Sequence, residues 1–292
     1  MGAGLKDFDL VVRFKNEGYV RPHGAVVEIG AQQLSNDVLR NRQKVRELGQ
    51  AFGITHDIDL PDPAASILMQ GVEHLDSAAP PSRLIWTWLG FEYAAIDIDG
   101  SPGSIPLDLN FDDVPKKFKK HFQLVTNLGT TEHVANQLQA FKIIHDLTAD
   151  SGVMIHNLPA QGFMNHGLVN YNLKFFWMLA RSNGYKLIYS DFTVADKPYR
   201  LPENIADDIR NFETNIDERA KNFEAIDCGI TVAMQKVIDI EFVPPIDVPT
   251  GTVVTDKKLL NRYWTVFKPN AFRLKKLPSR LMSDFRRRFR IS

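Results

Sequence analysis

The chain has 292 residues, 44% of them hydrophobic and 24% charged, which is typical of globular proteins and excludes a largely disordered chain. Its 35 basic and 35 acidic residues give a formal net charge of zero, which excludes a strongly basic nucleic-acid-binding protein as a description of the whole chain. The single cysteine, Cys228, excludes an internal disulfide framework and a CxxC zinc site. No signal-peptide pattern and no apolar run of about 18 residues is present, so we expect a cytoplasmic protein without a transmembrane segment.

Strand-like and helix-like segments alternate along the chain, which predicts an α/β fold. The first strand covers Ala25–Ile29, runs into Gly30 and precedes a polar, helix-compatible stretch at 36–52. Residues 55–82 hold several prolines, aspartates and serines and predict an insertion or lid. The later predicted strands are 93–98, 105–109, 122–127, 152–158, 185–192 and 228–238, and the later predicted helices are 83–89, 131–147, 174–183 and 202–224.

The C-terminal part differs in composition from the rest. Three prolines within 242–252 predict an extended connector or a loop that folds back on the body. Residues 272–292 carry eight basic residues and one acid, a net charge of +7, so the rest of the chain carries −7. Leu281, Phe285 and Phe289 would form an apolar stripe on a helix. This tail either packs its stripe on the body or contacts an anionic membrane surface peripherally, and we favour packing.

Polar side chains recur where the predicted strands end. Glu28 and Gly30 close the first strand, Asp97 the second and Asn127 the fourth, and Asp108 lies in the third. In open α/β sheets such ends line the crevice where ligands bind, and an acid after the second strand commonly binds ribose hydroxyls. Dinucleotide-binding proteins place that acid about 20 residues after the glycines. The gap here is 67 residues, for which the insertion at 55–82 would account.

These residues resemble the motifs of class I S-adenosylmethionine-dependent methyltransferases. Val27-Glu28-Ile29-Gly30 is similar to the first motif, Ala95-Ile96-Asp97-Ile98 to the ribose motif and Leu107-Asp108-Leu109 to the adenine segment. Gly129-Thr130-Thr131-Glu132-His133 resembles the start of the helix after the fourth strand. The resemblance covers about residues 25–239 and implies a Rossmann-like, doubly wound, mixed sheet of seven strands with helices on both faces.

The resemblance also implies S-adenosylmethionine as the cofactor. The cofactor-binding residues that it implies are Glu28, Gly30, Gln32, Asp97, Asp108 and Asn127. Gln32 and Gln33 stand where family members usually have two further glycines, and Gln32 could instead hydrogen-bond the amino-acid part of the cofactor. Asp97 could alternatively cap a turn with Asp99, and Asp108 could start one.

Hydrogen-bonding residues gather after the fifth predicted strand and suggest an acceptor site. The predicted substrate-binding residues are His156, Asn165, Asn170 and Tyr171. His166 is the predicted catalytic base, because a histidine titrates near neutral pH, although an ordered-loop or substrate-orienting role is the alternative. No carboxylate or third histidine joins His156 and His166 at ligand spacing, so no metal site is predicted. His133 is interpreted as a structural residue at a helix start.

We therefore expect methyl transfer to a small-molecule or glycan-like acceptor. A methyltransferase-like domain would span residues 1–240, and a C-terminal extension would span 241–292. The replacement of glycines by Gln32 and Gln33 motivates an alternative, a non-catalytic binding or scaffold protein of the same fold. The absence of GxGxxG and the 67-residue spacing count against a nicotinamide-dependent enzyme. The oligomeric state is left open.

Overall fold

The computed structural model describes residues 2–61, 67–69, 72–74, 79–100, 103–163, 166–194, 197–199, 227–249 and 251–267. The predicted helix at 202–224, the basic tail at 272–292 and Asn165 lie outside these residues.

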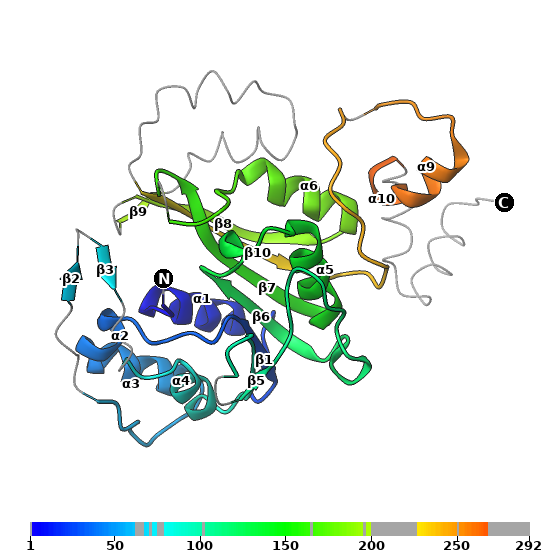
Figure 1. The fold of residues 1–292 in the computed structure, drawn as a ribbon. Helices are drawn as coiled ribbons and strands as arrows, with labels where there is room; N and C mark the ends of the chain where they lie inside the picture. Colours follow the sequence, from blue (N-terminus) through cyan, green and yellow to red (C-terminus); the bar gives the residue numbers. More distant parts are fainter. Residues whose placement is uncertain are drawn as a thin grey trace, which may run out of the picture.

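A mixed sheet of eight strands forms the centre of the molecule (Figure 1). Its order is β5-β4-β1-β6-β7-β10-β8-β9, and the strands are Ser104–Ile105, Glu92–Ile96, Ala25–Ile29, Phe122–Leu128, Thr148–Gln161, Cys228–Gln235, Lys186–Val194 and Lys197–Tyr199 in that order. The first five run parallel, whereas β10 is antiparallel to both of its neighbours. The predicted seven-stranded mixed sheet is therefore confirmed, and the three-residue β9 extends its edge.

Helices cover both faces of this sheet (Figure 1). One apolar cluster joins the first face to α1 (Leu5–Asn16), α2 (Asn36–Arg40), α3 (Arg42–Ala51) and α4 (Arg83–Trp88). A second cluster joins the other face to α5 (Gln137–Leu147) and α6 (Leu173–Asn183). Because successive side chains of a strand point to opposite faces, Val26 belongs to the first cluster and Val27 to the second.

Short elements complete the described chain. They are the separate hairpin of β2 (Ile67–Met69) and β3 (Val72–His74), the 3-10 helices η1 (Lys116–Phe118) and η2 (Thr131–His133), and the helices α9 (Lys257–Arg262) and α10 (Trp264–Phe267). The hairpin lies within the predicted insertion. No helix among the described ranges is long and apolar enough to cross a membrane.

Two predicted helices differ from the observed ones. The continuous helix expected at 131–147 is instead η2 followed by α5, because the side chain of Asn136 accepts a hydrogen bond from Gln139 N and begins a new helix there. The stretch at 36–52 is divided at Asn41, whose φ of −108° and ψ of 62° are not helical. Helix α1 was not predicted at all, although Phe8, Val11 and Phe14 have helical spacing and are buried.

The segment after β10 folds back on the body, as one of the two sequence interpretations expects. The side-chain amide of Asn183 donates to Val243 O at 2.8 Å and accepts from Val243 N at 2.8 Å. Arg181 Nη1 donates to Val248 O at 2.6 Å. These bonds fix the connector along the C-terminal part of α6.

Candidate functional site

The strand order reverses beside β1. The chain moves outward from β1 to β4 and β5 and then returns to β6 on the other side of β1. In open α/β sheets such a switch point opens a crevice at the carboxyl ends of the strands. The loops that follow β1 and β6 meet there, since Gln32 Nε2 donates to Thr130 Oγ1 at 3.2 Å. The predicted cofactor residues Gly30 and Gln32 therefore lie at the switch point.

Gly30 allows these two loops to approach each other. Its φ is +80°, and a Cβ atom built on it would lie 2.3 Å from Thr130 Oγ1. Both facts favour glycine, because it has no side chain and readily adopts positive φ. The chain then continues as an extended segment, in which Gln33 O accepts from Ala3 N and Leu34 N donates to Pro80 O, both at 2.8 Å. A helix does not follow the first strand directly.

Glu28 is buried beneath this loop and is fully engaged within the protein. Its carboxylate accepts hydrogen bonds from Ser82 Oγ and Trp86 Nε1 at 2.7 Å, from Tyr93 OH at 2.8 Å and from Gln32 N at 3.1 Å. Burial raises its pKa, and the four donors act in the opposite direction. These contacts organise the loop around Gln32, and direct cofactor binding by Glu28 stays a prediction.

Asp97 follows β4 directly and borders the same crevice. Its Oδ2 accepts from Ala31 N at 2.9 Å and its Oδ1 from Asp99 N at 3.3 Å, while the side chain stays partly exposed. Asp108 Oδ1 accepts from Asn110 N at 2.7 Å, which is the pattern of an Asx turn. Asp97 and Asp108 thus make turn-forming contacts, which the sequence analysis gave as the alternative to cofactor binding.

Asn127 and His156 lie deeper, inside the sheet. Asn127 Nδ2 is 2.8 Å from Thr131 Oγ1 and 3.2 Å from His156 Nδ1. The His156 ring packs against Phe141 and Phe176 with ring centroids 5.4 and 5.3 Å apart, and only 1% of the residue is exposed. Burial lowers its pKa to about 3, so it is neutral at pH 7. A substrate would have to displace core side chains to contact it.

The two other described substrate-site residues lie in different surroundings. Tyr171 is buried, and its hydroxyl is 2.8 Å from Thr131 Oγ1 and 2.5 Å from Gln137 Oε1. It therefore helps to hold η2 against α5. Asn170 Nδ2 donates to Gly162 O at 3.2 Å at the surface of the loop after β7. Their roles in substrate binding remain predictions.

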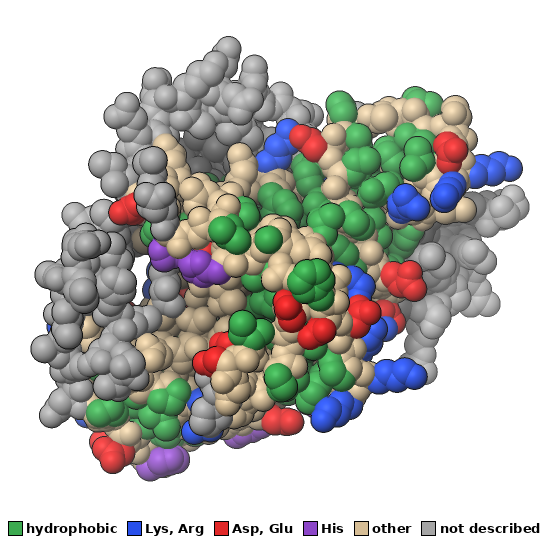
Figure 2. All heavy atoms as spheres, viewed as in Figure 1, with side chains coloured by type: hydrophobic (Ala, Val, Ile, Leu, Met, Phe, Trp, Pro, Cys, Tyr) green, Lys and Arg blue, Asp and Glu red, His purple; other side chains and the backbone are tan. Residues whose placement is uncertain are grey.

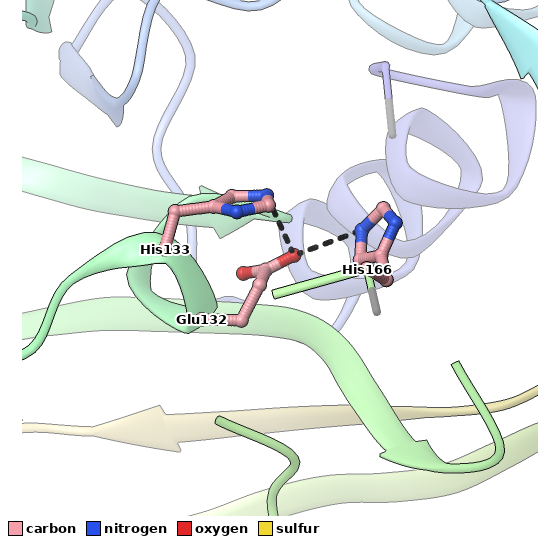
Figure 3. A group of neighbouring side chains, drawn as sticks. All are labelled: Glu132, His133 and His166. Atoms are coloured by element: carbon pink, nitrogen blue, oxygen red, sulfur yellow. Dashed lines mark ion pairs between the residues drawn. The ribbon is translucent and has the colours of Figure 1, made fainter. Parts of the chain in front are cut away.

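His166 lies beside two residues that the sequence analysis did not group with it (Figure 3). Glu132 Oε1 is 3.7 Å from His166 Nε2 and 3.9 Å from His133 Nε2, and the two imidazole rings have centroids 5.3 Å apart. The side chain of Glu132 is 0% exposed, whereas those of His133 and His166 are 50% and 29% exposed. Figure 2 shows histidine side chains at the surface of the face that it draws.

Burial governs the proton affinities in this group, which we call the Glu132 cluster (Glu132, His133 and His166). Because a charged carboxylate is poorly solvated there, the pKa of Glu132 is raised to about 7. The pKa values of His133 and His166 are both lowered, again mainly by burial. At neutral pH the cluster therefore combines neutral imidazoles with a carboxyl group that readily exchanges its proton.

Comparisons with known proteins find similarity only among solved structures. No protein-family model and no curated protein matches the sequence. A sarcosine dimethylglycine methyltransferase from Galdieria sulphuraria, named as such provisionally, is 11% identical with a TM-score of 0.44, over 80% of this chain and 86% of that one. A 1,6-didemethyltoxoflavin-N1-methyltransferase from Burkholderia thailandensis, with bound S-adenosylhomocysteine, is 11% identical with a TM-score of 0.39, over 80% and 78%. A SAM-dependent methyltransferase from Archaeoglobus fulgidus is 12% identical with a TM-score of 0.38, over 78% and 94%.

The fold is assigned from the order and direction of this chain's own strands. Five parallel strands wound in two directions from β1, followed by an inserted antiparallel β10, are the doubly wound mixed sheet that the sequence resemblance implies. The chain has the class I methyltransferase fold. In this fold, Gly30, Gln32 and Asp97 lie at the switch point between β4, β1 and β6.

The class I methyltransferase fold also brings together what the sequence analysis kept apart. His133 follows β6 and His166 follows β7, so adjacent parallel strands deliver both to one edge of the sheet. His156, which the sequence analysis placed with His166 in the predicted acceptor site, lies in the core. The sequence carried part of the signal for this grouping. A Glu-His pair follows one predicted strand and a histidine follows the next, and such residues meet when the two strands are neighbours.

Proposed function

We propose that the protein transfers a methyl group from S-adenosylmethionine to a small-molecule or glycan-like acceptor. The observation that carries the proposal is the gathering of Gly30, Gln32 and Asp97 at the topological switch point of a class I methyltransferase fold. Gly30 and Gln32 lie in the loop after β1, and Asp97 directly follows β4, so all three predicted cofactor-binding residues come from the ends of neighbouring central strands.

The crevice residues are suited to hold such a cofactor. Within the described residues, Oδ1 of Asp97 accepts one long bond, at 3.3 Å, and the side chain is partly exposed, so it retains capacity for ribose hydroxyls. Gly30 adds no side chain of its own to the crevice, and the place that a Cβ atom would take is occupied by Thr130 Oγ1. Gln32 would meet the amino-acid part of the cofactor with its side-chain amide, which now spans Gly30 O and Thr130 Oγ1.

Little catalytic chemistry is then required of the protein. The bound sulfonium supplies an activated methyl group, so the residues must orient the acceptor and exclude water. In the transfer, an acceptor oxygen or nitrogen bonds to the methyl carbon while the carbon–sulfur bond breaks and its electron pair stays on sulfur. In the proposed direct route the acceptor proton goes to the partly exposed imidazole of His166, whose lowered pKa leaves the ring neutral and able to accept a proton near pH 7.

The proposal is tested by calorimetric titration of the purified chain with S-adenosylmethionine and S-adenosylhomocysteine. We expect micromolar binding that falls by at least about tenfold in Asp97→Ala, since hydrogen bonds to charged groups contribute about 1.5–3 kcal/mol. Asp113→Ala is the control, because Asp113 is a surface carboxylate paired with Lys142. Absence of binding by the wild-type chain would contradict the cofactor assignment and favour the non-catalytic scaffold alternative.

A further inference from the structure

The carboxylate of Glu132 is buried without the partners that such a group needs. Neither of its oxygens receives a hydrogen bond from any group in the described ranges, and its side chain has no exposed surface. Glu28, which is also 0% exposed, receives four hydrogen bonds. A buried carboxylate without donors is costly unless a cation or a proton compensates its charge.

The surrounding backbone is built to bring His166 to this carboxylate. Leu168 N and Val169 N both donate to Glu132 O, at 2.7 and 3.1 Å. A Cβ atom at Gly167 would lie 2.9 Å from Glu132 Cγ, so only glycine lets the loop pass this close. The approach of the two segments is therefore specific, and it leaves Nε2 of His166 also buried without a hydrogen bond within the described residues.

We propose that Glu132, His133 and His166 bind one divalent transition-metal ion. Their ligand atoms all lie within 4.8 Å of one another, and both Nε2 atoms face Glu132 Oε1, at 3.7 and 3.9 Å (Figure 3). Ligand–metal distances of about 2.0–2.2 Å require ligand atoms about 2.8–3.6 Å apart, according to the coordination geometry. Small rotations of two partly exposed imidazoles would close the remaining gap around an ion.

The ligand set selects the class of ion. Two imidazoles and one carboxylate suit zinc, iron, cobalt or nickel, whereas magnesium and calcium prefer oxygen ligands throughout. Three protein ligands also leave coordination positions open, which is the pattern of catalytic rather than structural sites. An acceptor hydroxyl bound at an open position would lose its proton more readily, because a bound cation stabilises the oxyanion.

The use of the ion in this inference rests on the proposed methyl transfer, whereas the binding of the ion does not. The cluster lies at the carboxyl ends of β6 and β7, and Thr130, two residues before Glu132, contacts Gln32 in the cofactor crevice. A metal at this place would meet the acceptor and not the cofactor. His166 would then act on the acceptor as a ligand of the ion, and the acceptor proton would pass to solvent water instead of to the imidazole.

Metal binding is tested on the full chain after treatment with EDTA and dialysis. Titration with Co²⁺, followed by visible absorption, and with Zn²⁺, followed by calorimetry and competition with Co²⁺, should each give one equivalent. His133→Gln and His166→Gln should each weaken binding by at least about 100-fold, because the loss of even an outer-shell partner costs 10–100-fold. Glu132→Gln should do the same, and circular dichroism checks that each variant is folded.

A matched control uses His121, another histidine close to a carboxylate. Its Nε2 lies 3.5 Å from Glu92 Oε1 at the surface, so His121→Gln should leave the affinity unchanged. Absence of stoichiometric binding, or binding unchanged in His133→Gln and His166→Gln, would overturn the proposal. Failure of the proposed function is distinguishable, because Asp97→Ala should weaken cofactor binding and leave Co²⁺ binding unchanged, whereas His133→Gln should weaken Co²⁺ binding and leave cofactor binding unchanged.

Discussion

The contact between Gly30 and Thr130 shows how single residues define the crevice. Ala25–Ile29 and the following glycine were predicted from an apolar run and a turn residue, which are local signals. The three side-chain donors to Glu28 come from residues 54, 58 and 65 positions away, so no local pattern could reveal them. The sequence could thus predict where the strand ends, but not which of its polar groups already have hydrogen-bond partners in the protein and which can bind a ligand.

Gly30→Ala should destabilise the protein by about 2–4 kcal/mol, because a steric overlap with Thr130 Oγ1 adds to the cost of positive φ. Gly18→Ala is a matched control, since Gly18 has a φ of +79° with no atom within 4 Å of the added Cβ, and should cost only about 1 kcal/mol. Adding Thr130→Ala should recover the steric part of the loss. Urea unfolding measures all four proteins, and equal losses for the two glycine variants would disprove the close-contact argument.

Among the secondary-structure elements, α5 shows where sequence-based prediction succeeds and where it fails. The spacing of Phe141 and Ile144 correctly predicted a helix that packs on the sheet. Its beginning was wrong, because Asn136, not Thr131, supplies the N-cap. Its end depends on Lys236, which lies 91 residues away from the carbonyl that it contacts and could not be associated with α5 from the sequence.

Lys236→Met should reduce the free energy of unfolding by about 1–3 kcal/mol. The buried ammonium group donates to His145 O at 2.9 Å and Thr148 O at 3.2 Å, so its loss leaves carbonyls at the end of α5 without a donor. Lys174→Met removes an exposed ion pair with Asp247 and should change stability by less than about 0.5 kcal/mol. If chemical denaturation finds the two variants equally stable, the capping role of Lys236 is wrong.

At the scale of the whole molecule, the class I methyltransferase fold was predictable because each central strand is a short apolar run that ends in a turn. The alternation of strands and helices fixes the winding of such a sheet, since parallel strands need crossovers. Function was less accessible. The Glu132 cluster depends on the adjacency of β6 and β7, which is a property of the assembled sheet and not of either segment.

Buried neutral histidines should make the whole molecule sensitive to acid. The pKa of His145 is lowered to about 4, mainly by burial, and its Nε2 bonds Ile240 O at 2.8 Å while its Nδ1 lies 2.6 Å from Tyr185 OH. Because the unfolded chain binds the proton first, the contribution of His145 to stability should be fully present above about pH 6.5 and be lost as the pH decreases toward 4. His145 contributes at most about 1.4 kcal/mol per pH unit to this slope.

His145→Gln should therefore flatten the fall in stability between pH 6.5 and 4, as measured by urea unfolding at a series of pH values. His121→Gln, at the surface, should keep the wild-type slope. A slope that is the same in His145→Gln as in the wild-type chain would mean that other groups account for the acid sensitivity.

The central claim, that this fold holds S-adenosylmethionine at the switch point, is tested most directly by a crystal structure grown with S-adenosylhomocysteine. The account predicts the nucleoside at the carboxyl ends of β1 and β4, with a ribose hydroxyl within hydrogen-bond distance of the Asp97 carboxylate and the amino-acid part beside Gly30 and Gln32. A ligand bound elsewhere, or crystals that contain none at millimolar concentration, would contradict it.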